Sequence, residues 1–287
     1  MTDVVEVNSK MEMNKPIPAR REAGPASSSR RAMPEWLVTL LWQLFVVFAI
    51  VGFWQLAHEM KWGVPIVVQS PVAVLNTLVE LAQGDLLWPN YWATLKATII
   101  GLLIAVVIGT PIGLFLGIVQ SVQRVMAPFI SAINSMPRIA LAPVFIIVFG
   151  IDMWAKVALS VSLCVFIMML NGMAGVSAAD SEALRMMRTL GATRSQILRK
   201  VVLPAAMPSI LVGIRLSLIY SLLGVIASEL IASQDGLGQM IAGSAGVFDL
   251  ATVYAVLLLL MITAALLNTG SEIVGRLLLR WQPPETR

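Results

Sequence analysis

The chain has 287 residues, of which 58% are hydrophobic and 13% are charged, and its mean hydropathy is +0.84. Soluble domains carry about 45–50% apolar and about 25% charged residues, so this composition excludes both an ordinary water-soluble fold and a disordered chain. A single Cys and a single His exclude an internal disulfide framework and a Cys/His zinc site. The net charge of +4 is too small to indicate nucleic-acid binding. The composition therefore predicts a polytopic membrane protein.

Six apolar stretches are long enough to cross a bilayer as helices. A crossing needs about 20 mostly apolar residues, because each residue adds about 1.5 Å and the hydrocarbon layer is about 30 Å thick. The stretches lack the alternation of polar and apolar residues that is typical of a membrane β-barrel. We therefore expect an all-α fold with six transmembrane helices, at residues 36–57, 92–119, 127–150, 155–174, 206–232 and 247–278.

The polar segments define the domain organisation and the orientation. Residues 1–34 are rich in Ser, Pro, Lys and Arg, and we expect a disordered tail there because the segment cannot bury enough apolar surface to fold. Residues 35–282 are predicted to form one membrane domain with a polar loop at 177–204, followed by a short tail at 283–287. Fifteen of the 20 Lys and Arg residues lie on the side of the tails and this loop, and only Lys61 and Lys156 lie on the other side. This asymmetry predicts a multi-pass protein of the cell (inner, cytoplasmic) membrane with both termini cytoplasmic.

The loop at 177–204 is longer than the usual connection between two membrane helices. Its polar and apolar residues recur with a helical period, which predicts two short amphipathic helices separated at Gly191. Glycine can adopt a left-handed turn at this position at little cost, and Pro204 then marks the start of the fifth span. The five cations of the loop favour a helix pair that lies on anionic membrane lipid. The same periodicity is equally compatible with docking to a protein.

The spacing within this loop resembles a motif of ABC importer permeases. Gly191 is followed by an aliphatic residue at Val201 and then by Leu203-Pro204, as in the cytoplasmic EAA loop of that family. The Glu-Ala-Ala triplet of the motif is absent, since its positions hold Arg185, Met186 and Met187 and the nearby Glu182-Ala183 pair lies three residues too early. Three further stretches resemble permeases for nitrate, sulfonate, taurine and bicarbonate, and together the match covers residues 65–280. They are Gln69-Ser70-Pro71, the stretch from Pro137-Arg138 to Gly150, and the stretch from Glu229 to Gly238.

The resemblance implies the membrane subunit of a type I ABC importer, which works by alternating access. Its substrate would be a small anion like those above, delivered by a periplasmic or extracellular substrate-binding protein. In this family the loop forms a coupling helix that docks on an ABC ATPase dimer. The residues of this chain at the docking positions are Glu182, Ala183, Met187, Leu190, Gly191, Ala192, Arg194, Leu203 and Pro204.

The sequence contains no Gly-x-x-x-x-Gly-Lys-Ser/Thr phosphate loop, so it lacks this means of binding a nucleotide. We therefore expect a transport subunit with no catalytic residues, no metal and no cofactor of its own, while ATP and Mg belong to the separate ATPase. One coupling loop per chain against a two-fold ATPase dimer predicts a homodimer of this chain.

Ionisable residues inside the spans are the candidate residues of the substrate pathway. Each costs about 2.5–3.5 kcal/mol on insertion scales, so each needs a partner or an aqueous cavity. Arg138 lies near the middle of the third span, next to prolines that break helices where transporters bind substrate. It either attracts an anion in the pathway or forms a buried ion pair. Arg215 is expected to pair with another span or to reach lipid phosphates, and Glu229 to cap a helix or to pair. The candidate pathway residues are Ser135, Pro137, Arg138, Arg215 and Glu229.

Gly109, Gly113 and Gly117 recur every four residues in the second span and predict a closely packed neighbouring helix. Two other classes of protein are less compatible with the sequence. A secondary transporter driven by an ion gradient, the leading alternative, would show internal repeats and paired acids near the midplane. An intramembrane protease would need a base next to a buried Ser, yet the one His, His58, lies at a membrane edge.

Overall fold

The structure of the protein is a computed structural model that describes residues 35–62 and 69–279. The predicted tails at 1–34 and 283–287 lie outside these residues. The chain divides into two units, residues 1–51 and 52–287. Helix α1 (Glu35–Glu59) supplies the described part of the first unit and continues into the second. Its apolar stretch, Leu37–Glu59, is long enough to cross a membrane.

The described residues form helices and turns without strands, which confirms the all-α prediction. Five helices of the described segments can cross a membrane alone, and a sixth crossing results if one bent pair counts as a span. After α1 the elements are α2 (Pro71–Gln83), α3 (Leu87–Ile118), α4 (Gln120–Ser135), the 3-10 turn η1 (Arg138–Leu141), α5 (Ala142–Phe149), α6 (Met153–Ser177), α7 (Ser181–Thr189), α8 (Arg194–Ile197), the π-turn η2 (Leu198–Val202), α9 (Leu203–Ile231), α10 (Leu237–Gly246) and α11 (Leu250–Leu278).

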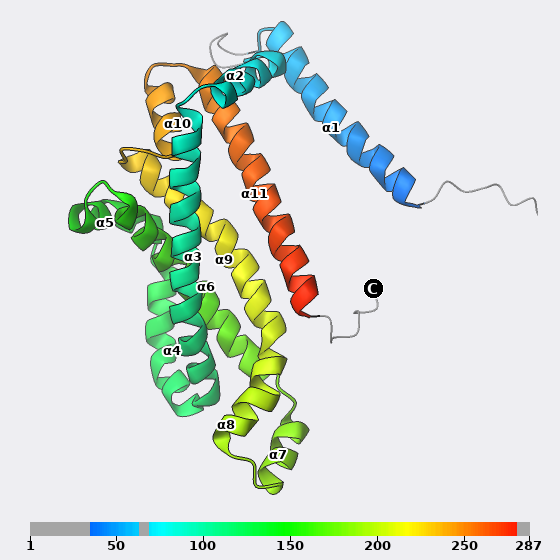
Figure 1. The fold of residues 1–287 in the computed structure, drawn as a ribbon, viewed down its shortest axis with the longest axis vertical. Helices are drawn as coiled ribbons and strands as arrows, with labels where there is room; N and C mark the ends of the chain where they lie inside the picture. Colours follow the sequence, from blue (N-terminus) through cyan, green and yellow to red (C-terminus); the bar gives the residue numbers. More distant parts are fainter. Residues whose placement is uncertain (1–34, 63–68, 280–287) are drawn as a thin grey trace, which may run out of the picture. The chain divides into compact units, whose positions relative to one another are not determined.

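Helices α3, α6 and α9 run side by side in the centre of the second unit (Figure 1). The glycine stripe of α3 allows α6 to approach closely. A Cβ atom added to Gly109 would lie 2.5 Å from the carbonyl oxygen of Val165, and one added to Gly117 would lie 2.7 Å from Cβ of Val176. Gly113 faces the backbone of Met169 in the same way. The predicted close packing is confirmed, and the neighbouring helix belongs to the same chain.

Buried hydroxyl groups link the three central helices. Ser221 on α9 donates a hydrogen bond to the carbonyl oxygen of Thr98 on α3 at 2.7 Å, and Ser160 on α6 lies 2.6 Å from the Ser221 hydroxyl. One apolar cluster joins α3 and α9 to α10 and α11, and two others pack α3, α6 and α9 against one another. Because the Ser160 and Ser221 hydroxyls have partners inside the bundle, they are buried without the cost of unsatisfied polar groups, whereas the buried hydroxyls of Thr110, Ser217 and Ser228 have no partner among the described residues.

The third predicted span, at 127–150, is not one straight helix. Helix α4 and the η1–α5 segment form a pair bent by 78°. Proline has no N–H group and pushes the preceding residue out of the helical region, and Met136 before Pro137 is extended, with φ −71° and ψ 134°. Pro143 lies in the first turn of α5, where a backbone N–H has no partner within the helix, so the proline does not interrupt the helix. The bend therefore places Arg138 at a helix break.

The two predicted short helices of the polar loop are present as α7 and α8. Asp180 caps α7 by accepting a hydrogen bond from the backbone N–H of Glu182, and Gly191 between the helices has φ +75°. Pro204 lies in the first turn of α9, as expected, but α8, η2 and α9 form one continuous helical segment from Arg194 to Ile231. The π-turn shifts the hydrogen-bond register directly before Pro204, in the first turn of α9, where its missing N–H is tolerated.

Candidate functional site

The α7–α8 loop lies at one end of the bundle, opposite α10 and the first turns of α3 (Figure 1). Its candidate docking residues are mostly at the surface. Leu190 is 74% exposed at the C-terminal end of α7, and Met186, which sequence reasoning did not select, is 59% exposed. Exposed apolar side chains next to cationic ones are typical of a surface that binds a partner. Exposed candidates are Glu182, Leu190, Gly191, Arg194, Leu203 and Pro204, and half-buried ones are Ala183, Met187 and Ala192.

Arg138 is 8% exposed at the break between α4 and α5. Its Nη1 donates hydrogen bonds to the carbonyl oxygens of Ser162 and Leu163, at 2.9 and 3.2 Å. Its Nη2 donates to Oδ1 of Asn134 at 2.7 Å, and the guanidinium lies 4.1 Å from the ring centroid of Phe166. No carboxylate of the described residues pairs with Arg138, so the buried ion pair, one of the two expectations, is wrong for this part of the chain.

A cavity of about 490 Å³ lies next to this guanidinium. Of the five candidate pathway residues, the cavity brings together only Pro137 and Arg138. Ser135 lies one residue from its lining and donates its hydroxyl hydrogen bond to the carbonyl oxygen of Ser131 instead. The lining residues are Asn134, Met136, Pro137, Arg138, Ile139, Leu163, Ile167, Leu216 and Tyr220.

The chemistry of the Arg138 cavity suits an anion. A guanidinium has five N–H donors, and the described contacts of Arg138 use three of them. Within the described residues its buried Nε has no acceptor. Because neutral oxygens and an aromatic ring hold the guanidinium, its positive charge is not neutralised by these contacts. Its planar N–H donors match the oxygens of carboxylates, phosphates and similar oxyanions.

Arg215 has a structural partner on another span, as one of its two expectations predicted. Its Nε donates a hydrogen bond to Oδ1 of Asn268 on α11 at 2.9 Å, and its Nη2 lies 3.5 Å from Oε2 of Glu272. Both side chains of the ion pair are about 40% exposed, so its contribution to stability is expected to be small. Arg215 does not line the Arg138 cavity.

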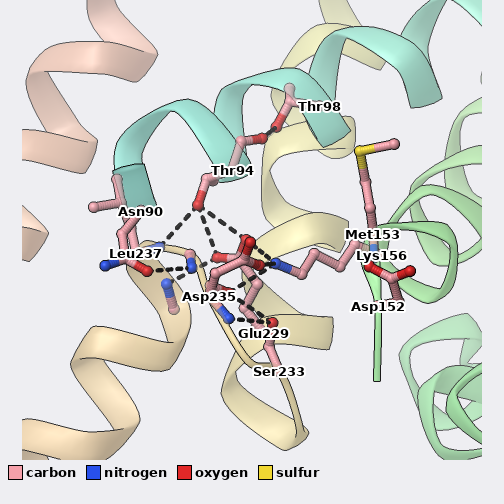
Figure 2. A network of polar contacts seen from close by, with 12 residues as sticks. Asn90, Thr94, Thr98, Asp152, Met153, Lys156, Glu229, Ser233, Asp235 and Leu237 are labelled. Atoms are coloured by element: carbon pink, nitrogen blue, oxygen red, sulfur yellow. Dashed lines mark hydrogen bonds and ion pairs between the residues drawn. The ribbon is translucent and has the colours of Figure 1, made fainter. Parts of the chain in front are cut away.

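Glu229 is buried to 99% at the end of α9, in the polar network of Figure 2. Its carboxylate accepts hydrogen bonds from the Thr94 hydroxyl at 2.9 Å, from the Gly238 N–H at 2.9 Å and from Nζ of Lys156 at 3.2 Å. The expectation that Glu229 pairs is confirmed. Lys156, which was counted among the cations of the outer side, is 2% exposed in the first turn of α6 and is therefore a buried partner rather than a surface charge. Sequence reasoning missed this pair, whose members are 73 residues apart.

The same network holds the turn between α9 and α10 against α3 and α6. Lys156 also donates to the carbonyl oxygen of Asp235 at 2.7 Å and to its carboxylate (Figure 2). From α3, Oδ1 of Asn90 accepts the Gly236 N–H at 2.6 Å. Gly236 has φ +109°, and a Cβ there would overlap the Glu229 carboxylate. The Gly-Leu-Gly stretch thus lets the backbone close over the buried acid.

Comparisons with known proteins agree with this architecture. The family described as "Binding-protein-dependent transport system inner membrane component" matches residues 109–282. The chain is 32% identical over 225 residues to the taurine transport system permease protein TauC of Escherichia coli (strain K12), covering 76% of this chain and 81% of the relative. It is 30% identical over 230 residues to the riboflavin transport system permease protein RibX of Chloroflexus aurantiacus, covering 80% and 86%.

A third relative is the putative aliphatic sulfonates transport permease protein SsuC of Escherichia coli (strain K12), at 29% identity over 250 residues, 87% of this chain and 94% of the relative. The fold is similar to that of a chain in a crystal form of the MetNI methionine ABC transporter in an inward facing conformation. That match has a TM-score of 0.61 at 22% identity and covers 67% of this chain and 95% of the other.

Proposed function

Because the chain belongs to the binding-protein-dependent transport system inner membrane components and is a type I ABC importer permease, we propose that ATP hydrolysed by a separate subunit drives its transport cycle. In this proposal a binding protein delivers a small anionic solute to one side of the membrane. The ATPase binds the α7–α8 loop on the cytoplasmic side, where both termini also lie. The chain contributes the pathway and the coupling surface and binds no cofactor.

The observation that carries the proposal is the exposed α7–α8 loop at one end of the membrane helices. Leu190 and Met186 are too exposed to serve the fold of the described chain, and their exposure is best explained by a protein partner. The loop is also rigidly connected, because α8 continues through η2 into α9. A displacement of the loop is therefore transmitted to the helix that reaches both the Arg138 cavity and Glu229.

The proposed substrate is a small oxyanion of the sulfonate or taurine type. The relatives TauC and SsuC are named for taurine and aliphatic sulfonates, whereas RibX is named for riboflavin. Between these, the Arg138 cavity favours the anions, because its guanidinium has unused N–H donors and, within the described residues, no carboxylate partner. A sulfonate presents the oxygens that such donors bind.

We further propose that two copies of this chain assemble with two ATPase subunits. Each chain has one α7–α8 loop, and a two-fold ATPase dimer offers two equivalent surfaces. The measurement is the mass of the purified complex. Two copies of this chain per two ATPase subunits are expected, and one copy next to a different permease would contradict the homodimer.

Site-specific crosslinking tests the docking surface. The single native cysteine, Cys164, is buried, so an introduced cysteine can be crosslinked without background. Leu190→Cys should crosslink to the ATPase subunit in membranes. Ser121→Cys, at the exposed start of α4, is the matched control and should not crosslink. If Leu190→Cys reacts with lipid probes and never with the ATPase, the loop lies on the membrane and the proposal fails.

A further inference from the structure

A second cavity lies at the end of the bundle opposite the α7–α8 loop. It has a volume of about 710 Å³ and shares no lining residue with the Arg138 cavity. It is formed by the first turns of α3 and α6 and by the turn after α9. Its volume is typical of cavities that bind small ligands. Six side chains determine its chemistry: Trp88, Trp92, Trp154, Lys96, Asp152 and Asp235.

One cation of this cavity is free to bind a ligand. Lys156 also lines it, but its three N–H donors are used by Oε1 of Glu229 and by the carbonyl and the carboxylate of Asp235 (Figure 2). Lys96 on α3 is exposed and makes no hydrogen bond or ion pair within the described residues. Lys96 is therefore the group that can attract the negative part of a ligand.

Two carboxylates of the cavity can attract a cation. Asp235 is 60% exposed and uses one carboxylate oxygen for Lys156. Asp152 is exposed and uses one oxygen to cap α6 through the N–H of Met153, at 2.7 Å. Asp152, Asp235 and the buried Glu229 supply three negative charges. Lys96 and Lys156 supply two positive ones, so the surroundings of the cavity carry a net negative charge. The cavity thus offers a positive contact from Lys96 and a negative contact from the two aspartates.

Three tryptophans give the cavity its apolar surface. Trp88, Trp92 and Trp154 are 47%, 51% and 53% exposed, and all three lie within the first two turns of helices long enough to cross the membrane. Tryptophan is enriched where a membrane helix passes the lipid headgroups, because the indole is apolar with one polar N–H. The face of the indole also attracts ammonium groups.

We propose that this cavity binds a phospholipid with a phosphoethanolamine headgroup. The phosphate lies at Lys96, the ammonium lies between Asp152 and Asp235, and the tryptophans cover the start of the acyl chains. A free amino-sulfonate carries the same two charges, but it has no acyl chains. It would therefore leave the half-exposed indoles without an apolar contact, which favours the lipid. Because the cavity lies opposite the α7–α8 loop, the lipid would belong to the outer leaflet. Only this assignment of the leaflet rests on the proposed function, which takes the α7–α8 end as cytoplasmic.

Native mass spectrometry of the purified full-length protein, stripped of lipid, tests the proposal. The probes are phosphatidylethanolamine, phosphatidylcholine and phosphatidylglycerol with identical acyl chains. We expect phosphatidylethanolamine to be retained about fivefold better than the others, the ratio that corresponds to about 1 kcal/mol for a partly exposed charge contact. Choline has no N–H to donate to a carboxylate, and glycerol has no charge.

Charge-neutralising variants assign the effect to this cavity. Lys96→Gln and Asp152→Asn should each lower the retention of phosphatidylethanolamine to the level of phosphatidylcholine, while asparagine still caps α6. Lys61→Gln and Asp85→Asn remove exposed charges that do not line the cavity and should leave retention unchanged. The melting temperature of each variant shows that the fold is intact.

Three results would overturn the proposal. The first is equal retention of the three lipids, or retention that Lys96→Gln does not change. The second is binding of free taurine or phosphoethanolamine in the absence of lipid retention, which would assign the cavity to a solute. The third is loss of binding-protein docking in Lys96→Gln with lipid retention unaltered. Loss of uptake alone would count against the proposed transport function and not against the lipid site.

Discussion

Replacing Lys156 with Met removes the ammonium that lies 3.2 Å from the buried carboxylate of Glu229. Met keeps most of the volume and the flexibility of the lysine stem, so packing changes little. Among the described residues, Glu229, with 1% exposure, would then keep only the Thr94 hydroxyl and the Gly238 N–H as donors. Breaking a buried pair in this way leaves an uncompensated charge and costs about 3–5 kcal/mol.

A second variant separates this charge effect from packing. In the Lys156→Met/Glu229→Gln double variant, the amide oxygen of Gln can still accept the Gly238 hydrogen bond, and no buried charge remains. We expect it to lose about 2 kcal/mol less than Lys156→Met alone, because residues in one polar network couple by about 0.5–3 kcal/mol. Asp235 contributes little to the difference, since it is 60% exposed and water can replace the ammonium.

The assay is the unfolding midpoint of the purified protein in one detergent, measured for the wild type, both single variants and the double variant. The account predicts that the double variant is more stable than Lys156→Met. If Lys156→Met is as stable as the double variant, Glu229 does not need its cation, and the ionic interpretation of the network is wrong.

Three further predictions concern the glycines and Arg138. Gly109→Ala should lower stability by about 1–3 kcal/mol, because its Cβ would overlap α6, whereas Gly270→Ala, with open space around it, should be neutral or slightly stabilising in the same thermal assay. Gly191→Ala should cost about 1–2 kcal/mol and Gly191→Asn less, since φ is +75° and asparagine tolerates this region; unfolding midpoints would show both. Arg138→Gln should raise the KM for anion uptake about tenfold or more with assembly intact, whereas Arg215→Gln should change it little; equal effects would contradict the Arg138 site.

Much of the fold follows from the sequence because lipid imposes strong rules on composition. The apolar stretches of α3, α6, α9 and α11 were predictable from length alone, and the glycine stripe indicated a close neighbour. The exposed α7–α8 loop was predictable from its helical period and from Gly191. These are local features, because each depends on residues that are consecutive or regularly spaced in the sequence.

The long-range contacts of the candidate sites were not predictable in this way. Lys156 was counted as an outer charge because its partner Glu229 is distant in sequence and close only in the fold. The bend at Pro137 was indicated by the proline, but a sequence does not specify which of two neighbouring prolines breaks a helix. The contacts of Arg138 with backbone carbonyl oxygens have no sequence pattern, because every residue carries a carbonyl group.

Uptake by reconstituted vesicles tests the central claim most directly. The purified chain, its ATPase and its binding protein are placed in vesicles, and labelled taurine is supplied to the side opposite the α7–α8 loop. The account predicts accumulation only when all three proteins are present and ATP with Mg is supplied on the loop side. Accumulation by the chain alone, driven by an imposed ion gradient without ATP, would contradict it.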